Sequence, residues 1–173
     1  SLETKINELL SKTDASLFVI YWSGHGTAIG NNSNYYMSDG TSNSYFSDAD
    51  LKPLLDQTNV PCVVIVDQCE AGGFASNCGG LNQVVMTASS ITENARAGLF
   101  GSPFTNNLAD AFSYHNNLYE YWVSVFVDWT YWWDLFGWFT PESPDTNSDM
   151  KITVSEAFNY AKSNVDDFWS GIM

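Results

Sequence analysis

Two side chains in the sequence, a thiol and an imidazole, have the chemistry of a covalent catalyst. Cys69 stands in the segment VDQCEAGG and His25 in the segment WSGHGT. A cysteine thiol is mostly protonated at neutral pH, and a neighbouring imidazole raises the fraction of reactive thiolate. The same imidazole can later protonate a leaving amine. The nearby glycines let backbone approach a ligand, and the amides of Gly26 and Cys69 are natural oxyanion donors. These residues predict nucleophilic catalysis on an acyl group.

The elements around both residues are expected to bring them to the same edge of a sheet. Residues 17–22 (LFVIYW) and 61–69 (PCVVIVDQC) are apolar runs typical of buried parallel strands, and residues 48–57 between them have a helical pattern. Ligands of parallel sheets bind beyond the carboxyl ends of the strands, where His25 and Cys69 fall. The alternative is that Cys69 is a small buried hydrophobe and His25 an ordinary loop histidine.

The rest of the chain extends this strand, helix, strand unit into an α/β class with a mostly parallel sheet. Residues 81–89 repeat the strand pattern more weakly, and residues 30–48 indicate mostly loop with a short hairpin strand at 35–37. Asp48 is expected to cap the helix that follows this loop. Further helices are expected near Leu2 to Leu10, at residues 106–114, and from Thr153 or Ser155 onward.

Composition limits the partners of this protein. The 173 residues, 45% of them hydrophobic, fit one domain over residues 1–173. A formal charge of -14 repels nucleic acid phosphates and anionic lipid surfaces, so neither is expected as a partner. The abundance of Asn, Ser, Thr, Tyr and Trp favours an extracellular or envelope location without deciding it. The first residues, SLETKINELL, do not have the pattern of a signal peptide.

An aromatic run at residues 118–139 has the length of a membrane span. Glu120, Asp128 and Asp134 interrupt it, and a charge at mid-bilayer depth costs on the order of a few kcal/mol. We therefore expect no transmembrane segment and assign the run to a core or an interface. It divides the predicted domain into a catalytic core at 1–115, the aromatic segment at 116–140 and a carboxyl-terminal part at 141–173.

The carboxyl-terminal part contains a predicted calcium loop. Residues 145–156 (DTNSDMKITVSE) match the calcium-loop template at ligand positions one, three, five and twelve. Met150 occupies the sixth position, where the template has glycine for a sharp turn. The alternative is an acidic turn that caps the following helix. The predicted ligands are Asp145, Asn147, Asp149, Lys151 through its carbonyl, Thr153 and Glu156.

The two other cysteines have no predicted chemistry. Cys62 falls inside a predicted strand and is expected to be buried, whereas Cys78 falls in a predicted loop. A disulfide between a buried strand position and a loop is not expected. The three cysteines also lack the paired spacing of a metal site.

The segments YWSGHGT at 21–27 and VVIVDQCEAGGF at 63–74 resemble the His-Gly and Cys blocks of the caspase-like superfamily of cysteine peptidases. This superfamily includes caspases, metacaspases, legumains, gingipains and clostripain. VVMTASSITENA at 84–95 and GLFGSPFTNNLADAF at 98–112 look like the segments that follow in legumain-type members, so the pattern is closest to legumain-like and prokaryotic caspase-like members. The resemblance covers roughly residues 1–115.

The resemblance implies a three-layer fold, with a mostly parallel sheet between helices, and a role for each matching residue. His25 would be the general acid/base, Cys69 the nucleophile, and the amides of Gly26 and Cys69 the oxyanion hole. No cofactor is required for such chemistry. The positions that match the regions lining the substrate pocket in relatives are Glu70, Ser89, Ser90, Glu93 and Asn94. Ordinary loop chemistry is an equal alternative for each of these five.

The sequence also departs from the pattern of the superfamily. Asp67 and Ala71 replace the Gln and Gly that flank the cysteine in caspases proper, which argues against cleavage after aspartate. The superfamily fold begins with a strand, helix and strand, of which only a helix is expected here. A separate amino-terminal fragment of the same precursor is therefore a candidate partner, beside the peptide or protein substrate.

Three hypotheses follow from these observations. The first is a cysteine endopeptidase that acts through a Cys-His dyad and an acyl-enzyme. The second is a secreted, calcium-stabilised binding module that uses the aromatic residues at 129–138. The third is a non-catalytic relative of the peptidases, against which the presence of both His25 and Cys69 argues.

Overall fold

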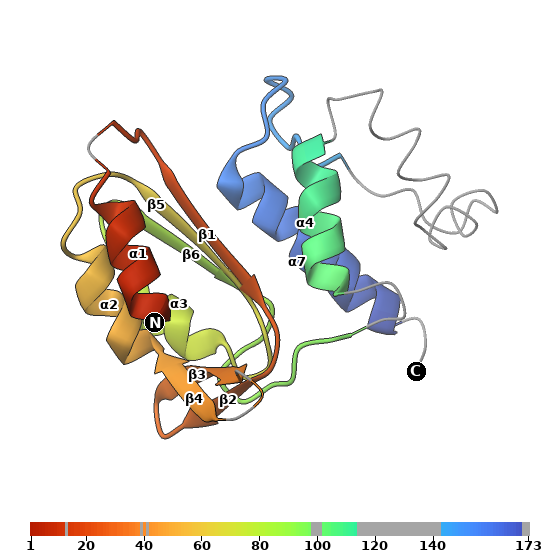
Figure 1. Ribbon diagram of the computed structural model, residues 1–173. Coiled ribbons are helices and arrows are strands. Elements are labelled where there is room, and N and C mark those ends of the chain that lie inside the picture. Colours follow the sequence, from red (N-terminus) through yellow and green to blue (C-terminus); the bar gives the residue numbers. More distant parts are fainter. Residues whose placement is uncertain (13, 39, 41, 98–101, 114–142, 171–173) are drawn as a thin grey trace. The chain divides into compact units, whose positions relative to one another are not determined.

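The computed structural model of the protein describes every residue except 13, 39, 41, 98–101, 114–142 and 171–173. The chain forms two compact units, Ser1–Arg96 and Ala97–Met173, which we describe separately (Figure 1).

The first unit is built on a parallel three-stranded sheet, here called sheet A. Its strands are β1 (Phe18–Ser23), β5 (Cys62–Asp67) and β6 (Gln83–Thr87), in the spatial order β1-β5-β6. Both pairings are parallel. All three strands were predicted from their apolar runs, and the β1–β5 pairing confirms the predicted crossover unit.

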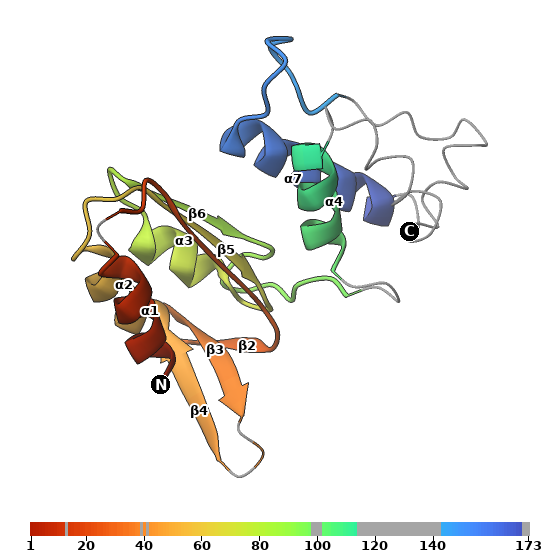
Figure 2. The same ribbon diagram turned by 45° about the horizontal axis from the view of Figure 1, so that its top comes forward.

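Three helices cover one face of sheet A, as the two ribbon views show (Figures 1 and 2). They are α1 (Leu2–Leu10), α2 (Asp48–Leu55) and α3 (Gly72–Cys78). This parallel sheet with flanking helices is the α/β class that the sequence predicts.

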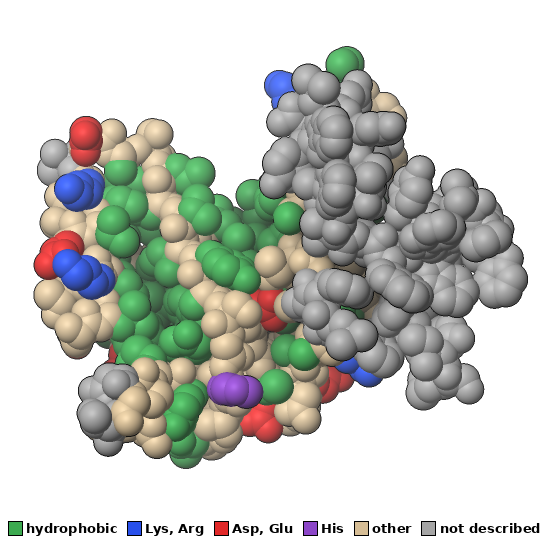
Figure 3. Space-filling model, turned by 45° about the vertical axis from the view of Figure 1, so that its right-hand side comes forward, with side chains coloured by type: hydrophobic (Ala, Val, Ile, Leu, Met, Phe, Trp, Pro, Cys, Tyr) green, Lys and Arg blue, Asp and Glu red, His purple; other side chains and the backbone are tan. Residues whose placement is uncertain are grey.

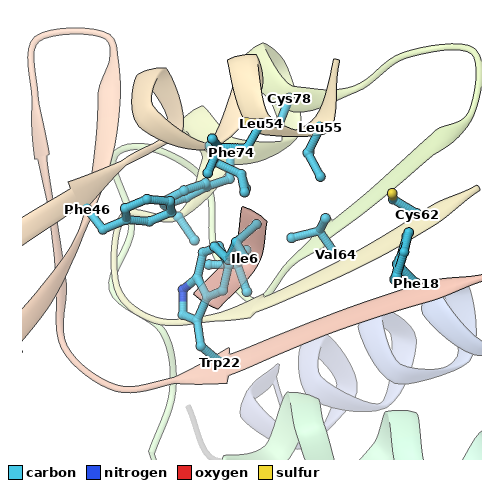
Figure 4. Packing of buried hydrophobic residues seen from close by; sticks show 13 residues of the cluster. Ile6, Phe18, Trp22, Phe46, Leu54, Leu55, Cys62, Val64, Phe74 and Cys78 are labelled. Carbon is cyan, nitrogen blue, oxygen red and sulfur yellow. The ribbon is translucent and has the colours of Figure 1, made fainter. Parts of the chain in front are cut away.

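The hydrophobic core lies between these helices and alternate residues of the strands (Figure 4). Trp22 of β1 is its aromatic centre, with ring centroids 5.1 Å from Phe74 and 6.4 Å from Phe46. Both contacts are edge-to-face, the arrangement that aromatic quadrupoles favour. Trp22 therefore ties the strand that leads to His25 to the helix that follows Cys69.

A second, antiparallel sheet occupies the segment that was expected to be mostly loop. Sheet B consists of β2 (Gly26–Ile29), β3 (Asn32–Ser38) and β4 (Asn43–Ser47). The loop prediction was wrong because Asn and Ser conceal the alternation of these strands. One face of sheet B nevertheless contributes to the core, with Phe46 buried and Tyr35 and Met37 packed against the cluster.

Asp48 does not cap α2, contrary to the prediction. Ser47 is the capping residue: its hydroxyl accepts from the Asp50 amide at 3.2 Å, and the Asp50 carboxylate accepts from the Ser47 amide at 2.9 Å. Asp48 is instead fully buried, where one carboxylate oxygen accepts from the Ser33 amide at 3.0 Å and from the Asn77 side chain at 2.9 Å. This carboxylate links sheet B to α2 and α3.

Helix α3 was not expected, because Gly72 and Gly73 suggested a turn and Cys78 a loop. The helix forms because the glycines permit close packing: a Cβ on Gly73 would lie 2.4 Å from the buried Asp48 Oδ2 and 2.6 Å from the Ser33 amide nitrogen. Cys78 is consequently buried at the end of a helix, and the loop prediction for it was wrong. All three cysteines are free.

The second unit contains two packed helices among its described residues, α4 (Pro103–Ser113) and α7 (Val154–Ser170). The Phe104 and Phe158 rings join them edge-to-face, 6.2 Å apart. Both helices were predicted. No helix among the described residues is long and apolar enough to cross a membrane. The aromatic run at 118–139 lies outside the described residues.

The packing around Gly73 gives a first prediction. Gly73→Ala places a methyl group against Asp48 and Ser33, so we expect a loss of roughly 2 kcal/mol or more in unfolding free energy. Urea denaturation measures this loss. The matched control is Gly79→Ala, whose added Cβ meets only the Ala75 carbonyl oxygen, at 3.5 Å. Equal stability of the two variants would contradict this account of α3.

Candidate active site

The pairing of β1 with β5 brings His25 and Cys69 to the same edge of sheet A. The last registered pair is Ser23 with Asp67, so each candidate residue lies two positions beyond the end of its strand. The Gly24 amide also donates to the Asp67 carbonyl at 3.1 Å, which extends the pairing by one step. The backbone therefore brings the loop of His25 next to the loop of Cys69, as the sequence predicts.

Gly26 is in direct contact with the loop that carries Cys69. A Cβ at this position would lie 2.1 Å from Nε2 of Gln68 and 2.6 Å from the Cys69 carbonyl oxygen. Real Cβ atoms essentially never come that close to another heavy atom. Only glycine fits at the start of β2, because the Gln68 side chain and the Cys69 carbonyl occupy the space that a side chain would need.

The amide of Gly26 points toward the Cys69 loop. The Tyr36 amide donates to the His25 carbonyl at 2.9 Å, which makes these two residues a hydrogen-bonded pair of the antiparallel ladder. Gly26 then belongs to the alternate, non-hydrogen-bonded pair, so its amide faces the outer edge of β2. The Ala28 amide, two residues on, faces the same edge and donates to the Glu70 carboxylate.

Two backbone amides near this edge are candidates for binding a ligand. Within the described part of the chain, the Cys69 amide has no hydrogen-bond acceptor. The Gly26 amide faces the edge of β2 that does not pair with β3. A pair of N–H groups beside a thiol can bind an oxygen that becomes anionic during reaction.

Ser89 holds the Cys69 loop from both sides. Its hydroxyl donates to the Gln68 carbonyl at 2.9 Å and accepts from the Ala71 amide at 3.1 Å. These are the residues immediately before Cys69 and two after it. Ser89 was predicted to line the substrate pocket; the structure shows its hydroxyl in contact with the nucleophile loop.

The buried side chain of Gln68 anchors the same loop to both sheets. Its Oε1 accepts from Trp22 Nε1 at 3.0 Å, and its Nε2 donates to the Asn34 carbonyl at 3.1 Å. Sequence reasoning did not identify Gln68, because a glutamine at the end of a strand has no distinguishing spacing. Its position directly before the candidate nucleophile was the one available signal.

Glu70 is occupied by contacts within the protein. Its backbone has a left-handed φ of 53°, and its carboxylate accepts from Ala28 and, at 3.2 Å, from the Thr27 hydroxyl. Its carbonyl accepts from the Ser33 hydroxyl. Glu70 therefore fastens the residue after Cys69 to sheet B, and its predicted role in the substrate pocket stays a prediction.

The other predicted pocket residues lie on the loop after β6. The Glu93 carbonyl accepts from the Glu70 amide at 2.7 Å, which brings this loop against the Cys69 loop, and the Glu93 carboxylate accepts from the Ser90 amide at 3.3 Å. The side chains of Ser90, Glu93 and Asn94 are exposed. The structure thus brings Ser89 and Glu93 to the Cys69 loop and leaves Ser90 and Asn94 at the surface.

The three thiols differ sharply in their environments. Burial raises the pKa of the Cys62 thiol. Burial, followed by the nearby Asp48 charge, raises the pKa of Cys78 to about 12, and its thiol donates to the Asp48 carbonyl at 3.3 Å. Cys69 is partly exposed, and His25 is exposed (Figure 3, where His25 is the only histidine among the described residues). Reagents and substrates in solution therefore reach Cys69 before the other two thiols.

Internal hydrogen bonds and one left-handed residue define the shape of the predicted calcium loop. Met150 adopts a left-handed φ of 64° at the position where the template has glycine, and Asp145 accepts from the amides of Asp149 at 3.2 Å and Met150 at 2.9 Å. No group of three or more His, Cys, Asp or Glu side chains among the described residues could hold a metal ion. The calcium site stays a prediction.

Glu156 closes this loop and begins α7. The carboxylate of Glu156 accepts hydrogen bonds from the Thr153 amide, the Thr153 hydroxyl and the Thr146 hydroxyl. These bonds lower the pKa of Glu156 to about 2. Because the carboxylate form is the one stabilised, its contribution to folding is complete above the ordinary value of 4.5 and is lost as pH falls toward 2.

Comparison with known proteins identifies the fold independently. The model of the peptidase family described as "Caspase domain" matches residues 1–128. This range includes all of sheet A, all of sheet B and the loops that carry His25 and Cys69. A search of curated proteins finds no match.

The contacts of Ser89 give a second prediction. Ser89→Ala removes the two hydrogen bonds that bracket Cys69, so we expect the unfolding free energy to fall by about 1–3 kcal/mol. Ser90→Ala is the matched control, because that hydroxyl contacts only its own loop at Thr92 and should change stability by about 0.5 kcal/mol or less. Chemical denaturation measures the unfolding free energy of both variants. If Ser89→Ala leaves this free energy unchanged, Ser89 does not hold the Cys69 loop.

Proposed function

Because this chain belongs to the caspase-domain family of cysteine peptidases, we propose that it is an endopeptidase with Cys69 as nucleophile and His25 as general acid/base. The observation that supports this most directly is the contact of Gly26 with the Cys69 carbonyl, since it joins the two loops that supply the thiol and the imidazole. Peptidases of this family need no cofactor for the chemistry.

Acylation follows from the positions of these groups. The Cys69 thiolate attacks the carbonyl carbon of the scissile peptide bond, and the amides of Gly26 and Cys69 stabilise the negative charge that develops on the oxygen. His25, protonated by the thiol, gives its proton to the leaving amine as the carbon–nitrogen bond breaks. The products of this step are a thioester with Cys69 and a free amine.

Deacylation reverses the role of the imidazole. His25, now neutral, accepts a proton from a water molecule, which attacks the thioester carbonyl. The same two amides stabilise the second tetrahedral intermediate, and the Cys69 thiolate leaves. Exposure of His25 to solvent supports this step, because water must reach the thioester from the imidazole side.

The rigid Cys69 loop supports efficient use of the oxyanion site. Ser89, Gln68 and Ser33 hold the residues on both sides of Cys69 through their side chains. A preorganised pair of amides costs no reorganisation when charge develops, which is the main advantage of such a site. The Ala71 amide bound by Ser89 belongs to this support and is not a candidate oxyanion donor.

For substrate selection we propose that the loop with Ser90, Glu93 and Asn94 contacts the residue before the scissile bond. Its exposed side chains and its attachment to Glu70 favour this placement. Glu93 would favour Arg or Lys, whereas a legumain-like specificity would favour Asn. Glu70 and Ser89 are less suited to touch substrate, because their polar atoms already bind Ala28 and the Cys69 loop.

We also propose that residues 145–156 bind calcium with low affinity after their side chains rearrange, because as they stand Asp145, Asp149 and Glu156 do not form a group that could hold a metal ion. The left-handed Met150 gives the loop the sharp turn that the template needs without glycine. Calcium must compete with Thr146 and Thr153 for the Glu156 carboxylate, since both oxygens already accept hydrogen bonds. This competition favours an affinity in the range of extracellular calcium modules, about 10⁻⁴ to 10⁻³ M.

The peptidase proposal predicts one selectively reactive thiol and an activity that depends on it. Iodoacetamide at neutral pH should alkylate Cys69 in the folded protein, faster than an unactivated thiol, and leave the buried Cys62 and Cys78 unmodified, as peptide mass spectrometry would show. After denaturation all three cysteines should react. A fluorogenic peptide library with varied residues before the scissile bond measures hydrolysis and specificity together.

In this library, Cys69→Ala should lower kcat by at least about 10³-fold. His25→Ala should lower kcat similarly and also slow the alkylation of Cys69. Cys62→Ala, which removes the same thiol from a buried strand position, is the matched control and should retain activity. Alkylation of Cys69 at the rate of an ordinary thiol, with hydrolysis unaffected by Cys69→Ala, would refute the proposal.

The calcium proposal predicts a stabilisation by calcium that needs both ends of the loop. Millimolar calcium should raise the melting temperature of the wild-type protein relative to chelator, and Asp145→Asn or Glu156→Gln should abolish the increase. Asp166→Asn is the control, because this exposed carboxylate pairs only with Lys162 on α7 and should leave the calcium effect intact. A wild-type protein that melts at the same temperature in calcium and in chelator would rule the site out.

A further inference from the structure

Sheet B presents two tyrosines on the face that does not contact the core. Tyr36 of β3 and Tyr45 of β4 are directly opposite each other, with ring centroids 5.7 Å apart in an edge-to-face arrangement. Their sequence neighbours Tyr35 and Phe46 face the core, so by alternation this aromatic pair faces away from it. Tyr45 lies on an edge strand and is 52% exposed.

His25 belongs to the same row as this aromatic pair. The Tyr36 amide donates to the His25 carbonyl at 2.9 Å, which places His25 across from Tyr36 in the continued ladder of β2 and β3. Residues directly opposite in an antiparallel pair share a face. The row therefore runs His25, Tyr36, Tyr45 across three neighbouring backbones, and in Figure 3 hydrophobic side chains lie beside His25 at the surface.

The row lies on the leaving-group side of the scissile bond. The Cys69 carbonyl lies where a Gly26 side chain would be, on the face of sheet B that Gly26 shares with Tyr35 and that the row does not occupy. The Gly26 amide faces the edge of β2 that does not pair with β3. In the proposed mechanism the acyl part of the substrate bonds to Cys69, whereas the leaving amine receives its proton from His25. The chain that follows this amine then continues from His25 away from Cys69, over β3 and β4.

The dimensions of a sheet and of a peptide agree with this path. Neighbouring strands are about 4.8 Å apart, so Tyr45 is roughly 10 Å along the row from His25. An extended peptide advances about 3.3 Å per residue, so the row spans the first three residues after the scissile bond. The second of these residues comes nearest to the aromatic pair.

We propose that Tyr36 and Tyr45 form a binding site for the substrate residues after the scissile bond, with preference for a neutral aromatic or apolar side chain at the second of them. The inference rests on the proposed peptidase function. Strands β2, β3 and β4 contain no charged residue, so the surface offers aromatic rings and hydroxyls and no ion pair to a substrate.

Three substrates with the same residues before the scissile bond test this site. Two are internally quenched peptides that carry Phe or Ser at the second position after the bond, and the third has a small fluorogenic amine in place of those residues. For the wild-type protein we expect kcat/KM to be roughly three- to tenfold higher for the Phe peptide than for the Ser peptide. Tyr45→Thr, and independently Tyr36→Thr, should bring this ratio close to one.

The fluorogenic amine does not reach the aromatic pair, so dividing each variant's kcat/KM for the Phe and Ser peptides by its kcat/KM for this amine corrects for any change at Cys69 and His25. Tyr21→Thr is the matched control: Tyr21 is 49% exposed on a strand of sheet A, and its loss should leave the Phe-to-Ser ratio as in the wild type. Hydrolysis with a ratio near one in the wild type, or a ratio that persists in both tyrosine variants, overturns the site alone. No hydrolysis of any of the three substrates overturns the peptidase function and this site with it.

Discussion

The parallel pairing of β1 with β5 is the constraint on which the rest of the site depends. The register ends at Ser23 and Asp67, so the two strands leave the sheet at the same level. His25 and Cys69 each follow two positions later in the sequence. A slip of one strand by one residue would turn Trp22 of β1 or Val64 of β5 out of the core and move one loop away from the other. Core packing and catalytic geometry therefore select the same register.

Polar side chains from distant parts of the sequence fix the Cys69 loop after it leaves the sheet. The Cys69 loop is not part of a strand or helix, so its backbone groups need partners from elsewhere. Gln68, Ser89 and Ser33 provide them, and the buried Asp48 holds Ser33 in turn. Such a network is costly when one member is missing, because each remaining buried group loses its partner. This cost explains how a loop beside solvent keeps one conformation.

Burial separates Cys69 from the two other thiols. Cys62 and Cys78 lie in the core, where the thiolate form is disfavoured, whereas Cys69 is partly exposed two positions beyond the end of β5. The groups that position Cys69 are mainly amides and hydroxyls. Hydrogen bonds, more than ion pairs, therefore hold this loop in place. Position in the fold, more than residue type, therefore distinguishes Cys69 from the two other cysteines.

The sequence alone determined the parallel strands, the helix between them and the placement of His25 and Cys69 at their ends, because continuous apolar runs and glycine-bounded turns are local signals. Sheet B and α3 were missed, since Asn and Ser hide the strand alternation and adjacent glycines imitate a turn. Only the tertiary structure decided the roles of Gln68, Ser89 and Asp48 in holding the Cys69 loop. Their partners are distant in the chain, and a polar residue carries no local mark of the backbone group that it will bind once buried. Gly26 illustrates this difference. The sequence predicted its amide as an oxyanion donor, but only the tertiary structure showed that the close approach of Cys69 leaves no room for a side chain there.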